Sequence, residues 1–287
     1  MVRAVDIVEL CLERFGPPVY VRHEIVHNPH VVHELRQKGA VFIERVEEVP
    51  TGQTVVFSAH GVAPSVWQEA RARGLRIIDA TCPLVTKVHL EALKYAREGY
   101  TVILVGHRGH DEVIGTMGEA PDRTVLIETA EEAAEVHVPN PSRVVALTQT
   151  TLSVDDTSEV IRVLKDRFPA LETRNDICYA TTNRQQAVKA MAQEVDMVLV
   201  IGAQNSSNCN RLRETAQTAG LPAYLISGPE DIDTAWFDGA KRVGITSGAS
   251  TPERLVIAVL DALRPLHVGS VQVAEENVSF VLPKELR

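Results

Sequence analysis

Residues 77–87 read IIDATCPLVTK, and this stretch sets the pattern by which the rest of the chain is interpreted. Its two β-branched isoleucines predict the end of a buried strand. A polar turn that carries Cys82 follows, and Thr86 begins a helical pattern. Open α/β sheets place their chemistry at the carboxyl ends of their strands, so the thiol of Cys82 is predicted to lie at a functional edge of a sheet.

The same order of apolar strand, polar or glycine-rich loop and helix recurs along the chain. Loops of this kind lie at 58–61, 106–112, 148–151, 202–208 and 246–250. Strands that alternate with helices in this way indicate an α/β fold with parallel sheets. Each loop leads into a helix N-terminus, whose free N–H groups bind anions.

The length of 287 residues is too great for one simple core, so we expect several α/β domains. The expected sections are 1–82, 83–175 and 176–265, followed by a tail over 266–287. The first section begins inside a helical pattern. The strand that a βαβ arrangement needs before that helix is therefore expected to be missing.

The formal net charge of -9 argues against nucleic acid as a partner. No apolar run approaches the ~20 residues of a membrane span, and no signal peptide precedes the first amphipathic pattern. We therefore expect a cytoplasmic protein without a membrane partner. A small anionic substrate is compatible with this charge, because the groups around a site decide its local potential.

Four widely spaced cysteines do not form a disulfide framework in a cytoplasmic protein. Cys82 and Cys178 each stand beside threonines before a predicted helix, and neither belongs to a CxxC pair. Two thiols in matching loops favour metal ligation or nucleophilic chemistry about as strongly as structural packing. Cys11 lies on the apolar stripe of a predicted helix and Cys209 just past a helix start, so both are expected to be packing residues.

His27, His60 and His110 each lie in a loop after a predicted strand, with few basic residues nearby. One such histidine usually serves its loop through a hydrogen bond, but three suggest an anion site built from imidazoles and helix dipoles. Glu112 lies two residues after His110 and is a candidate general acid or base. Without the histidines, its expected role would be that of a solvated loop charge.

Polar side chains also gather after two later strands, at Ser206, Ser207, Asn208 and Ser250. Ser250 begins a capping-box pattern and the other three fit a helix N-terminus, so N-capping and anion binding are both compatible with them. Thr150 ends an unusually polar Thr-Gln-Thr stretch. A hydrogen-bond network around a reacting group and ordinary turn chemistry both explain that stretch.

Together these residues resemble one family, the 4-hydroxy-3-methylbut-2-enyl diphosphate reductases, which act last in the non-mevalonate isoprenoid pathway. The resemblance covers essentially the whole chain and rests on long, specific motifs. The motifs are VRHE at 21–24, HN at 27–28, FSAHGV at 57–62, DATCPLVTK at 79–87, GTMG at 115–118, TQTTLSVDDT at 148–157, DICYATTNRQ at 176–185 and NSSNCNRL at 205–212.

The resemblance implies three similar α/β domains with small, mainly parallel sheets around a central 4Fe-4S cluster, to which each domain gives one cysteine. Cys82 and Cys178 match two of these metal ligands. Glu112 matches the catalytic proton donor, and Thr150 matches the catalytic threonine beside it; Gln149 would extend their network. The residues that match the substrate-binding set are His27, His60, His110, Thr150, Ser206, Ser207, Asn208 and Ser250.

The implied reaction is the reductive dehydroxylation of (E)-4-hydroxy-3-methylbut-2-enyl diphosphate to isopentenyl diphosphate and dimethylallyl diphosphate. Two electrons and two protons remove the C4 hydroxyl group as water. The cluster iron that has no protein ligand would bind this hydroxyl group as a Lewis acid, and Glu112 would protonate it. The electrons would arrive one at a time from a ferredoxin- or flavodoxin-like donor.

One motif of the resembled family is absent. Its first cluster cysteine lies in an Asn-Pro-Arg-Gly-Phe-Cys-Ala-Gly-Val type of segment, which this sequence lacks. Aligned on RAV at 3–5, that cysteine would fall before Met1, which stands where the family has valine. Cys11 lies about thirteen residues further on, ~20 Å along a helix, and does not replace it. We therefore expect the sequence to be a truncated reading of a complete enzyme.

Two other functions are compatible with parts of the sequence. A mononuclear zinc hydrolase would use Cys82, Cys178 and a histidine. A non-catalytic diphosphate-binding protein would keep the anion-binding loops without the cluster. Neither of them explains motifs that run along the full length of the chain.

Overall fold

The computed structural model describes residues 2–174, 176–276 and 278–287. Over these ranges the chain forms three small sheets in which every strand pair is parallel. The predicted α/β class with small parallel sheets is thereby confirmed. No helix within the described ranges combines the length and apolar character needed to cross a membrane.

The chain divides into two compact units. Unit 1 consists of Met1–Val26, His30–Ile177 and Ser279–Arg287, and unit 2 consists of His27–Pro29 and Cys178–Val278. Two sheets belong to unit 1 and the third to unit 2. The predicted borders at residues 82 and 175 stay predictions.

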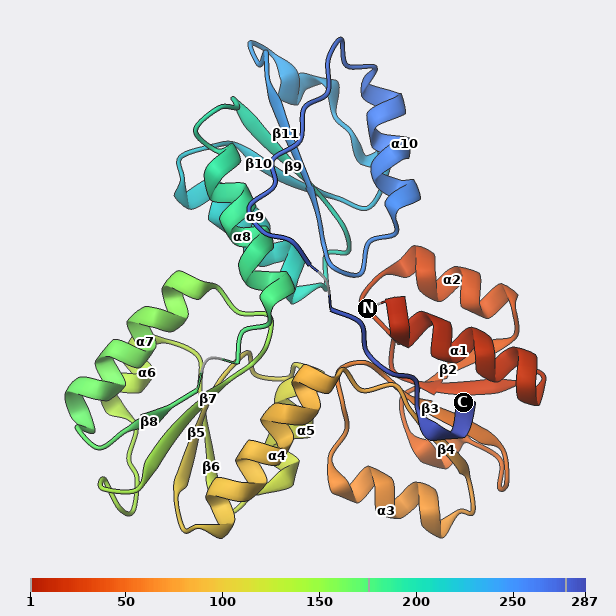
Figure 1. The fold of residues 1–287 in the computed structure, drawn as a ribbon, viewed down its shortest axis with the longest axis vertical. Helices are drawn as coiled ribbons and strands as arrows, with labels where there is room; N and C mark the ends of the chain where they lie inside the picture. Colours follow the sequence, from red (N-terminus) through yellow and green to blue (C-terminus); the bar gives the residue numbers. More distant parts are fainter. Residues whose placement is uncertain (1, 175, 277) are drawn as a thin grey trace. The chain divides into compact units, whose positions relative to one another are not determined.

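The first sheet has the strand order β2-β1-β3-β4. Its strands, in chain order, are β1 (Val19–Arg22), β2 (Ala40–Ile43), β3 (Thr54–Phe57) and β4 (Arg76–Asp79). Helices α1 (Val2–Phe15) and α2 (Pro29–Gln37) cover one face, and α3 (Pro64–Ala72) covers the other (Figure 1). Successive side chains of a strand point to opposite faces. Val56 accordingly belongs to the core under α1, while Val55 and Phe57 belong to the core under α3.

The second sheet, also in unit 1, has the order β6-β5-β7-β8. Its strands are β5 (Thr101–Val105), β6 (Thr124–Ile127), β7 (Val144–Thr148) and β8 (Glu172–Thr173). Helices α4 (Pro83–Arg97) and α5 (Asp111–Glu119) pack on one face, and α6 (Ala130–Glu135) and α7 (Val154–Arg167) pack on the other (Figure 1). The two central strands are buried on both faces, which explains their continuous apolar sequence.

Unit 2 contains a three-stranded sheet with the order β10-β9-β11. Its strands are β9 (Met197–Ile201), β10 (Ala223–Ile226) and β11 (Val243–Ser247). Helices α8 (Tyr179–Met191) and α9 (Ser207–Thr218) share one core with the sheet, and α10 (Glu253–Leu263) packs on the other face. The short 3-10 turns are η1 (Val46–Glu48), η2 (Pro229–Asp231), η3 (Thr234–Phe237) and η4 (Lys284–Leu286).

The end of the chain contributes to unit 1. Leu282 and Leu286 pack against the core beneath α1, and the Val281 carbonyl oxygen accepts a hydrogen bond from Arg3 Nε at 2.9 Å. Residues at the two ends of the sequence therefore stabilise the same sheet.

The predicted start of the helix after Cys82 was wrong by one turn. The helix begins at Pro83 rather than at Thr86, with Cys82 as its N-cap residue. Proline is favoured in the first turn, because its missing N–H group would have had no partner within the helix. The thiol is therefore held at the helix terminus itself.

Gly118, in the last turn of α5, marks a close approach to the start of α3. A Cβ atom at this position would lie 2.3 Å from Ala63 Cβ and 3.1 Å from Ala63 Cα. Side-chain atoms do not approach so closely, so glycine is required for steric reasons. This contact explains the last residue of the GTMG motif at 115–118.

We predict that Gly118→Ala lowers the free energy of unfolding by ~1–3 kcal/mol through overpacking, although alanine is the better helix former. Ala63→Gly in the same chain should restore most of this loss, because it removes the atom that collides. Ala63→Gly alone should be close to neutral at an N-cap position. Urea unfolding of the three variants measures this, and a fully stable Gly118→Ala protein would contradict the prediction.

Candidate active site

In unit 1, four predicted site residues lie in, or in the helix turn directly after, loops that follow parallel strands. His60 follows β3, His110 and Glu112 follow β5, and Thr150 follows β7. Val105 at the end of β5 pairs with Thr148 at the end of β7, so both loops leave the sheet at the same edge. The Gln149 N–H donates to the Val105 carbonyl oxygen at 2.8 Å and extends this pairing by one residue.

Glu112 and Thr150 form a buried hydrogen-bonded pair, and each is 5% exposed. The backbone N–H of Thr150 donates to Glu112 Oε2 at 2.9 Å. The Thr150 hydroxyl lies 2.9 Å from Oε1 and 3.0 Å from Oε2. The carboxyl group is therefore fixed in position by a neutral neighbour that is able to exchange a proton with it.

Gln149 joins this loop to the loop after β5. Its Oε1 accepts the N–H of His107 at 3.0 Å, and its Nε2 donates to Thr151 Oγ1 at 2.8 Å. The amide spans the two loops that carry Glu112 and Thr150. These two hydrogen bonds stabilise the loops, and the part of Gln149 in the network of Glu112 and Thr150 stays a prediction.

His110 is the N-cap residue of α5. Its Nδ1 accepts the backbone N–H of Glu112 at 3.1 Å. In this geometry the ring proton lies on Nε2, so His110 presents a neutral N–H donor. The His60 ring stands edge-on to it, with centroids 5.8 Å apart, and His60 is 5% exposed.

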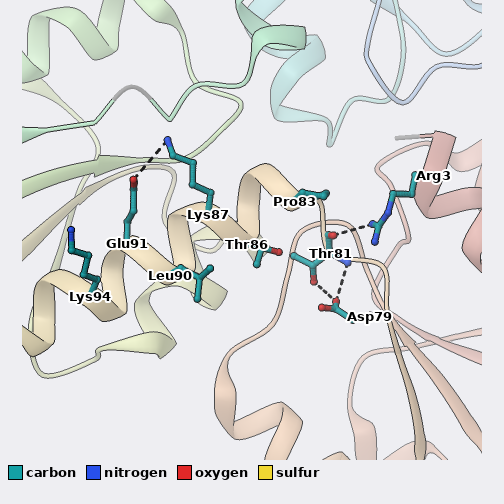
Figure 2. A pocket seen from close by; sticks show the side chains of 9 residues that line it. All are labelled: Arg3, Asp79, Thr81, Pro83, Thr86, Lys87, Leu90, Glu91 and Lys94. Atoms are coloured by element: carbon teal, nitrogen blue, oxygen red, sulfur yellow. Dashed lines mark hydrogen bonds and ion pairs between the residues drawn. The ribbon is translucent and has the colours of Figure 1, made fainter. Parts of the chain in front are cut away.

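Cys82 is tied to the loop that carries His60. The Cys82 N–H donates to the Ala59 carbonyl oxygen at 2.9 Å. Arg3 Nη1 donates to the Thr81 carbonyl oxygen at 3.1 Å, and Asp79 accepts hydrogen bonds from the N–H and hydroxyl of Thr81 (Figure 2). The turn before Cys82 is therefore held from both sides, and the thiol has a fixed position.

An open groove lies beside this turn, along the exposed side of α4 (Figure 2). It is lined by Arg3, Asp79, Thr81, Pro83, Thr86, Lys87, Leu90, Glu91 and Lys94. Lys87 in this groove reaches Asp176 Oδ1 at 3.0 Å, and the Asp176 side chain is fully buried. The Thr148 N–H lies 3.4 Å from Asp176 Oδ2. Lys87 is thus engaged in a structural ion pair within unit 1.

In unit 2, the predicted anion-binding residues gather at the carboxyl ends of β9 and β11. Ile201 pairs with Ser247 at these ends. Ser206 is the N-cap residue of α9 and accepts the N–H of Cys209 at 3.4 Å, which confirms its capping role. Ser207 and Asn208 form the first turn of α9, which is the positive end of the helix dipole.

Asn208 has the property expected of a ligand-binding side chain. It is 6% exposed, and neither its Oδ1 nor its Nδ2 has a hydrogen-bond partner among the described residues. A buried amide without partners is costly, so a bound polar group would stabilise it. The helix terminus and this amide together fit an anionic ligand.

Ser250 was predicted to begin a capping box, and this prediction was wrong. Helix α10 begins at Glu253, and its N-cap residue is Pro252, which has no side-chain cap. The hydroxyl of Ser250 instead donates to the His27 carbonyl oxygen at 3.1 Å. His27 and Ser250 therefore lie together in unit 2, although they are far apart in the sequence.

The four cysteines fall into two classes. Cys82 and Cys178 are partly exposed N-cap residues of α4 and α8, and Cys178 Sγ accepts the Thr181 N–H at 3.3 Å. Burial raises the pKa of the Cys11 thiol to about 12 and also raises the pKa of Cys209. Buried, protonated thiols are poor metal ligands, whereas thiols at helix N-termini are good ones.

Cys209 acts as a packing residue in unit 2. A Cβ atom at Gly202 or at Gly248 would lie 2.3 Å from its Sγ. The thiol therefore fills the space directly beneath the two glycine-containing loops. The expected packing roles of Cys209 and of Cys11, which lies in the core beneath α1, are both confirmed.

Sequence reasoning did not single out Asp111 and His23, which contact each other. His23 Nδ1 lies 2.7 Å from Asp111 Oδ1. The only sequence signal for Asp111 is its place between His110 and Glu112. His23 lies in the VRHE motif, but nothing in the motif indicates its partner.

Comparisons with known proteins agree over nearly the whole chain. A family model described as "LytB protein" matches residues 1–264. The 4-hydroxy-3-methylbut-2-enyl diphosphate reductase of Ralstonia nicotianae is 53% identical, over 99% of this chain and 90% of the relative. The enzyme of the same name from Pseudomonas entomophila is 54% identical, over 99% and 93%.

Solved structures give the same result. The E-1-hydroxy-2-methyl-but-2-enyl-4-diphosphate reductase from Plasmodium falciparum has a TM-score of 0.97 and 39% identity, and the match covers 99% of this chain and 92% of that one. A second structure, of (E)-4-hydroxy-3-methyl-but-2-enyl diphosphate reductase, has a TM-score of 0.66 and 37% identity, over 92% and 94%.

The contrast between the two classes of thiol leads to a labelling prediction. In the metal-free chain, iodoacetamide near neutral pH should alkylate Cys82 and Cys178 readily and leave Cys11 and Cys209 unmodified. The raised pKa values keep the two buried thiols protonated, so their reaction should begin only at strongly alkaline pH. Peptide mass spectrometry over a pH series measures this. Rapid labelling of Cys11 in the folded chain would contradict it.

Proposed function

The chain belongs to the LytB protein family, and on that premise we propose that it is a 4-hydroxy-3-methylbut-2-enyl diphosphate reductase. The proposed reaction converts (E)-4-hydroxy-3-methylbut-2-enyl diphosphate to isopentenyl diphosphate and dimethylallyl diphosphate. The C–O bond at C4 breaks, two electrons enter, one proton leaves with the hydroxyl group as water and one proton is added to carbon.

The observation that carries this proposal is the buried Glu112–Thr150 pair at the edge where two histidines meet. A hydroxide ion is a poor leaving group, and protonation by a positioned acid removes that difficulty. Glu112 is the only carboxyl group proposed for this step. Thr150 holds the Glu112 carboxyl group in place, so the proton would be donated from one of its two carboxyl oxygen atoms, whose positions are fixed.

The diphosphate group is proposed to be held by neutral dipoles and imidazoles. In unit 2 the proposed ligands are the N-terminus of α9, with Ser206, Ser207 and the buried amide of Asn208, which has no partner among the described residues, together with Ser250 and His27. In unit 1 they are His60 and His110, with Thr150 also proposed to contact the substrate. Free N–H groups at helix termini and histidine N–H groups are suitable donors for phosphate oxygens.

A 4Fe-4S cluster is the proposed cofactor, and the thiols of Cys82 and Cys178 would hold it. These residues fit the group, because each is an accessible soft donor at the N-terminus of a helix. When bound, the cluster supplies single electrons and a Lewis-acidic iron for the departing hydroxyl group. The third thiolate that the family pattern requires matches neither Cys11 nor Cys209, which are buried in packing roles.

The electron donor is proposed to be a ferredoxin- or flavodoxin-like protein, because such carriers deliver electrons one at a time. The cytoplasmic location stays a prediction. Of the rival functions, a zinc hydrolase would contain zinc and no sulfide, and a binding protein would take up the diphosphate without reducing it. The relatives named above are reductases, which favours the redox function.

We predict that Glu112→Gln lowers turnover of the hydroxylated diphosphate by ~10²–10⁴-fold, which is the usual contribution of a general acid. The iron and acid-labile sulfide content should be unchanged, because Glu112 is not a proposed cluster ligand. Product formation with a strong chemical reductant measures the effect without a protein donor. Thr150→Val should give a smaller loss, because it removes the hydroxyl contact and keeps the backbone N–H bond to Glu112.

Wild-type turnover by the Glu112→Gln enzyme would assign the proton to another group. Loss of iron in that variant would instead indicate a structural defect. Comparison with Glu112→Asp separates the acid function from the exact length of the side chain.

Cys82→Ser and Cys178→Ser should each lose most of the iron and acid-labile sulfide taken up on anaerobic reconstitution. The loss follows from removing a thiolate at a fixed helix terminus. Cys209→Ser is the matched control, since it makes the same chemical change at a buried thiol in a packing role. Iron and sulfide analysis together distinguish a cluster from zinc. Equal iron in the wild type and in all three variants would disprove the assigned ligands.

A further inference from the structure

Helix α5 begins with two acidic residues, and the proposed reaction uses only the second. Asp111 is the first residue of the helix, and its side chain is 17% exposed. Its Oδ1 lies 2.7 Å from His23 Nδ1, and its Oδ2 lies 3.9 Å from His60 Nδ1. The carboxylate therefore bridges a histidine with no assigned role and a histidine of the proposed site.

His23 is held in an unusual position to make this contact. Its backbone has a φ of 59°, a left-handed conformation that is uncommon outside glycine. Its N–H donates to the Ile43 carbonyl oxygen at 2.8 Å, and its Nε2 lies 3.6 Å from Glu44 Oε2. Because the backbone of His23 is fixed by the sheet, its ring holds the Asp111 carboxylate in one orientation.

The two site histidines of unit 1 have different partners at Nδ1. His110 Nδ1 accepts the Glu112 N–H. A proton on His110 Nδ1 would therefore collide with the backbone proton of Glu112. His60 Nδ1 faces the Asp111 carboxylate and also lies 3.4 Å from Ser58 Oγ. His110 is therefore held neutral, while His60 is in the environment that favours an imidazolium.

We infer that Asp111, fixed by His23, is a positioning residue that makes His60 the cationic imidazole of the anion site, beside the neutral donor His110. This inference rests on the proposed function only for the identity of the anion, the diphosphate group of the substrate. The division of charge between the two rings follows from their contacts alone. A phosphate oxygen would then meet one full positive charge and one N–H dipole.

The pH dependence follows from the groups around this pair. The groups of unit 1 that face Asp111 include His23, His60 and the Arg22 guanidinium; burial lowers the pKa of Arg22, and the Asp111 carboxylate acts in the opposite direction. The groups of unit 1 that face His60 include Asp111, Ser58 and the ring of His110. A carboxylate favours the charged form of histidine, so its removal makes His60 lose its proton at lower pH.

The test compares Asp111→Asn with Glu119→Gln. Glu119 is a matched control, because it lies on the same helix, is 16% exposed and contacts a different histidine, His89, at 3.0 Å. The affinity of the reconstituted protein for inorganic pyrophosphate is measured by calorimetry from about pH 5.5 to about pH 8.5, across the range in which histidine titrates. The titration of His60 is followed by NMR, with its signal assigned through His60→Asn.

In Asp111→Asn, we expect the His60 titration and the loss of pyrophosphate affinity to move about one pH unit lower, with roughly tenfold weaker binding at about pH 7. His23→Gln should move both in the same direction by a smaller amount. Glu119→Gln should match the wild type. Unchanged pH profiles in Asp111→Asn, or an equal loss in Glu119→Gln, would overturn the inference. Neither readout needs turnover, so an inactive reductase would leave this result standing.

Discussion

The parallel register of β5 and β7 is the constraint on which the unit 1 site depends. Val105 lies opposite Thr148, so the loops after both strands start at the same level along the strand direction of the sheet. Glu112 in the first turn after one loop then reaches Thr150 in the other. A shift of one residue would turn alternate side chains to the other face of the sheet and separate this pair. The pairing of Ile201 with Ser247 does the same for the loops of Ser206 and Ser250 in unit 2.

The surroundings of each thiol decide its chemistry. Cys11 and Cys209 lie in cores, where desolvation disfavours the thiolate and raises their pKa values. Cys82 and Cys178 are the N-cap residues of α4 and α8, where the first N–H groups of the helix have no helical partners, and the Thr181 N–H donates to Cys178 Sγ. Sequence spacing alone left metal ligation and packing about equal for these two. The helix termini favour ligation, because they supply the positive potential that a thiolate needs.

The alternation of apolar strands and polar loops was sufficient to predict the α/β class and the loops that carry the site. It also indicated a helix N-terminus at Ser206, Ser207 and Asn208, and Ser206 is the N-cap residue there, since capping depends on neighbours along the chain. Long-range pairs were missed for a physical reason. His23 and Asp111 are 88 residues apart, and Lys87 and Asp176 are 89 apart. Such pairs depend on which loops the sheets bring together. The periodicity of the sequence does not indicate which loops these are. Ser250 was misjudged for the same reason, because its partner is the distant His27 carbonyl group.

The scarcity of lysine and arginine among the proposed substrate ligands has a chemical advantage. A lysine beside Glu112 would stabilise its carboxylate form and make it a weaker proton donor. Helix termini and imidazoles attract an anion with fixed dipoles and with the one positive charge inferred for His60, so little reorganisation is needed when the anion binds. Lys87, the lysine on α4 near the cysteine turn, is already paired with the buried Asp176. A chain with a net charge of -9 is thus proposed to bind an anion through local geometry.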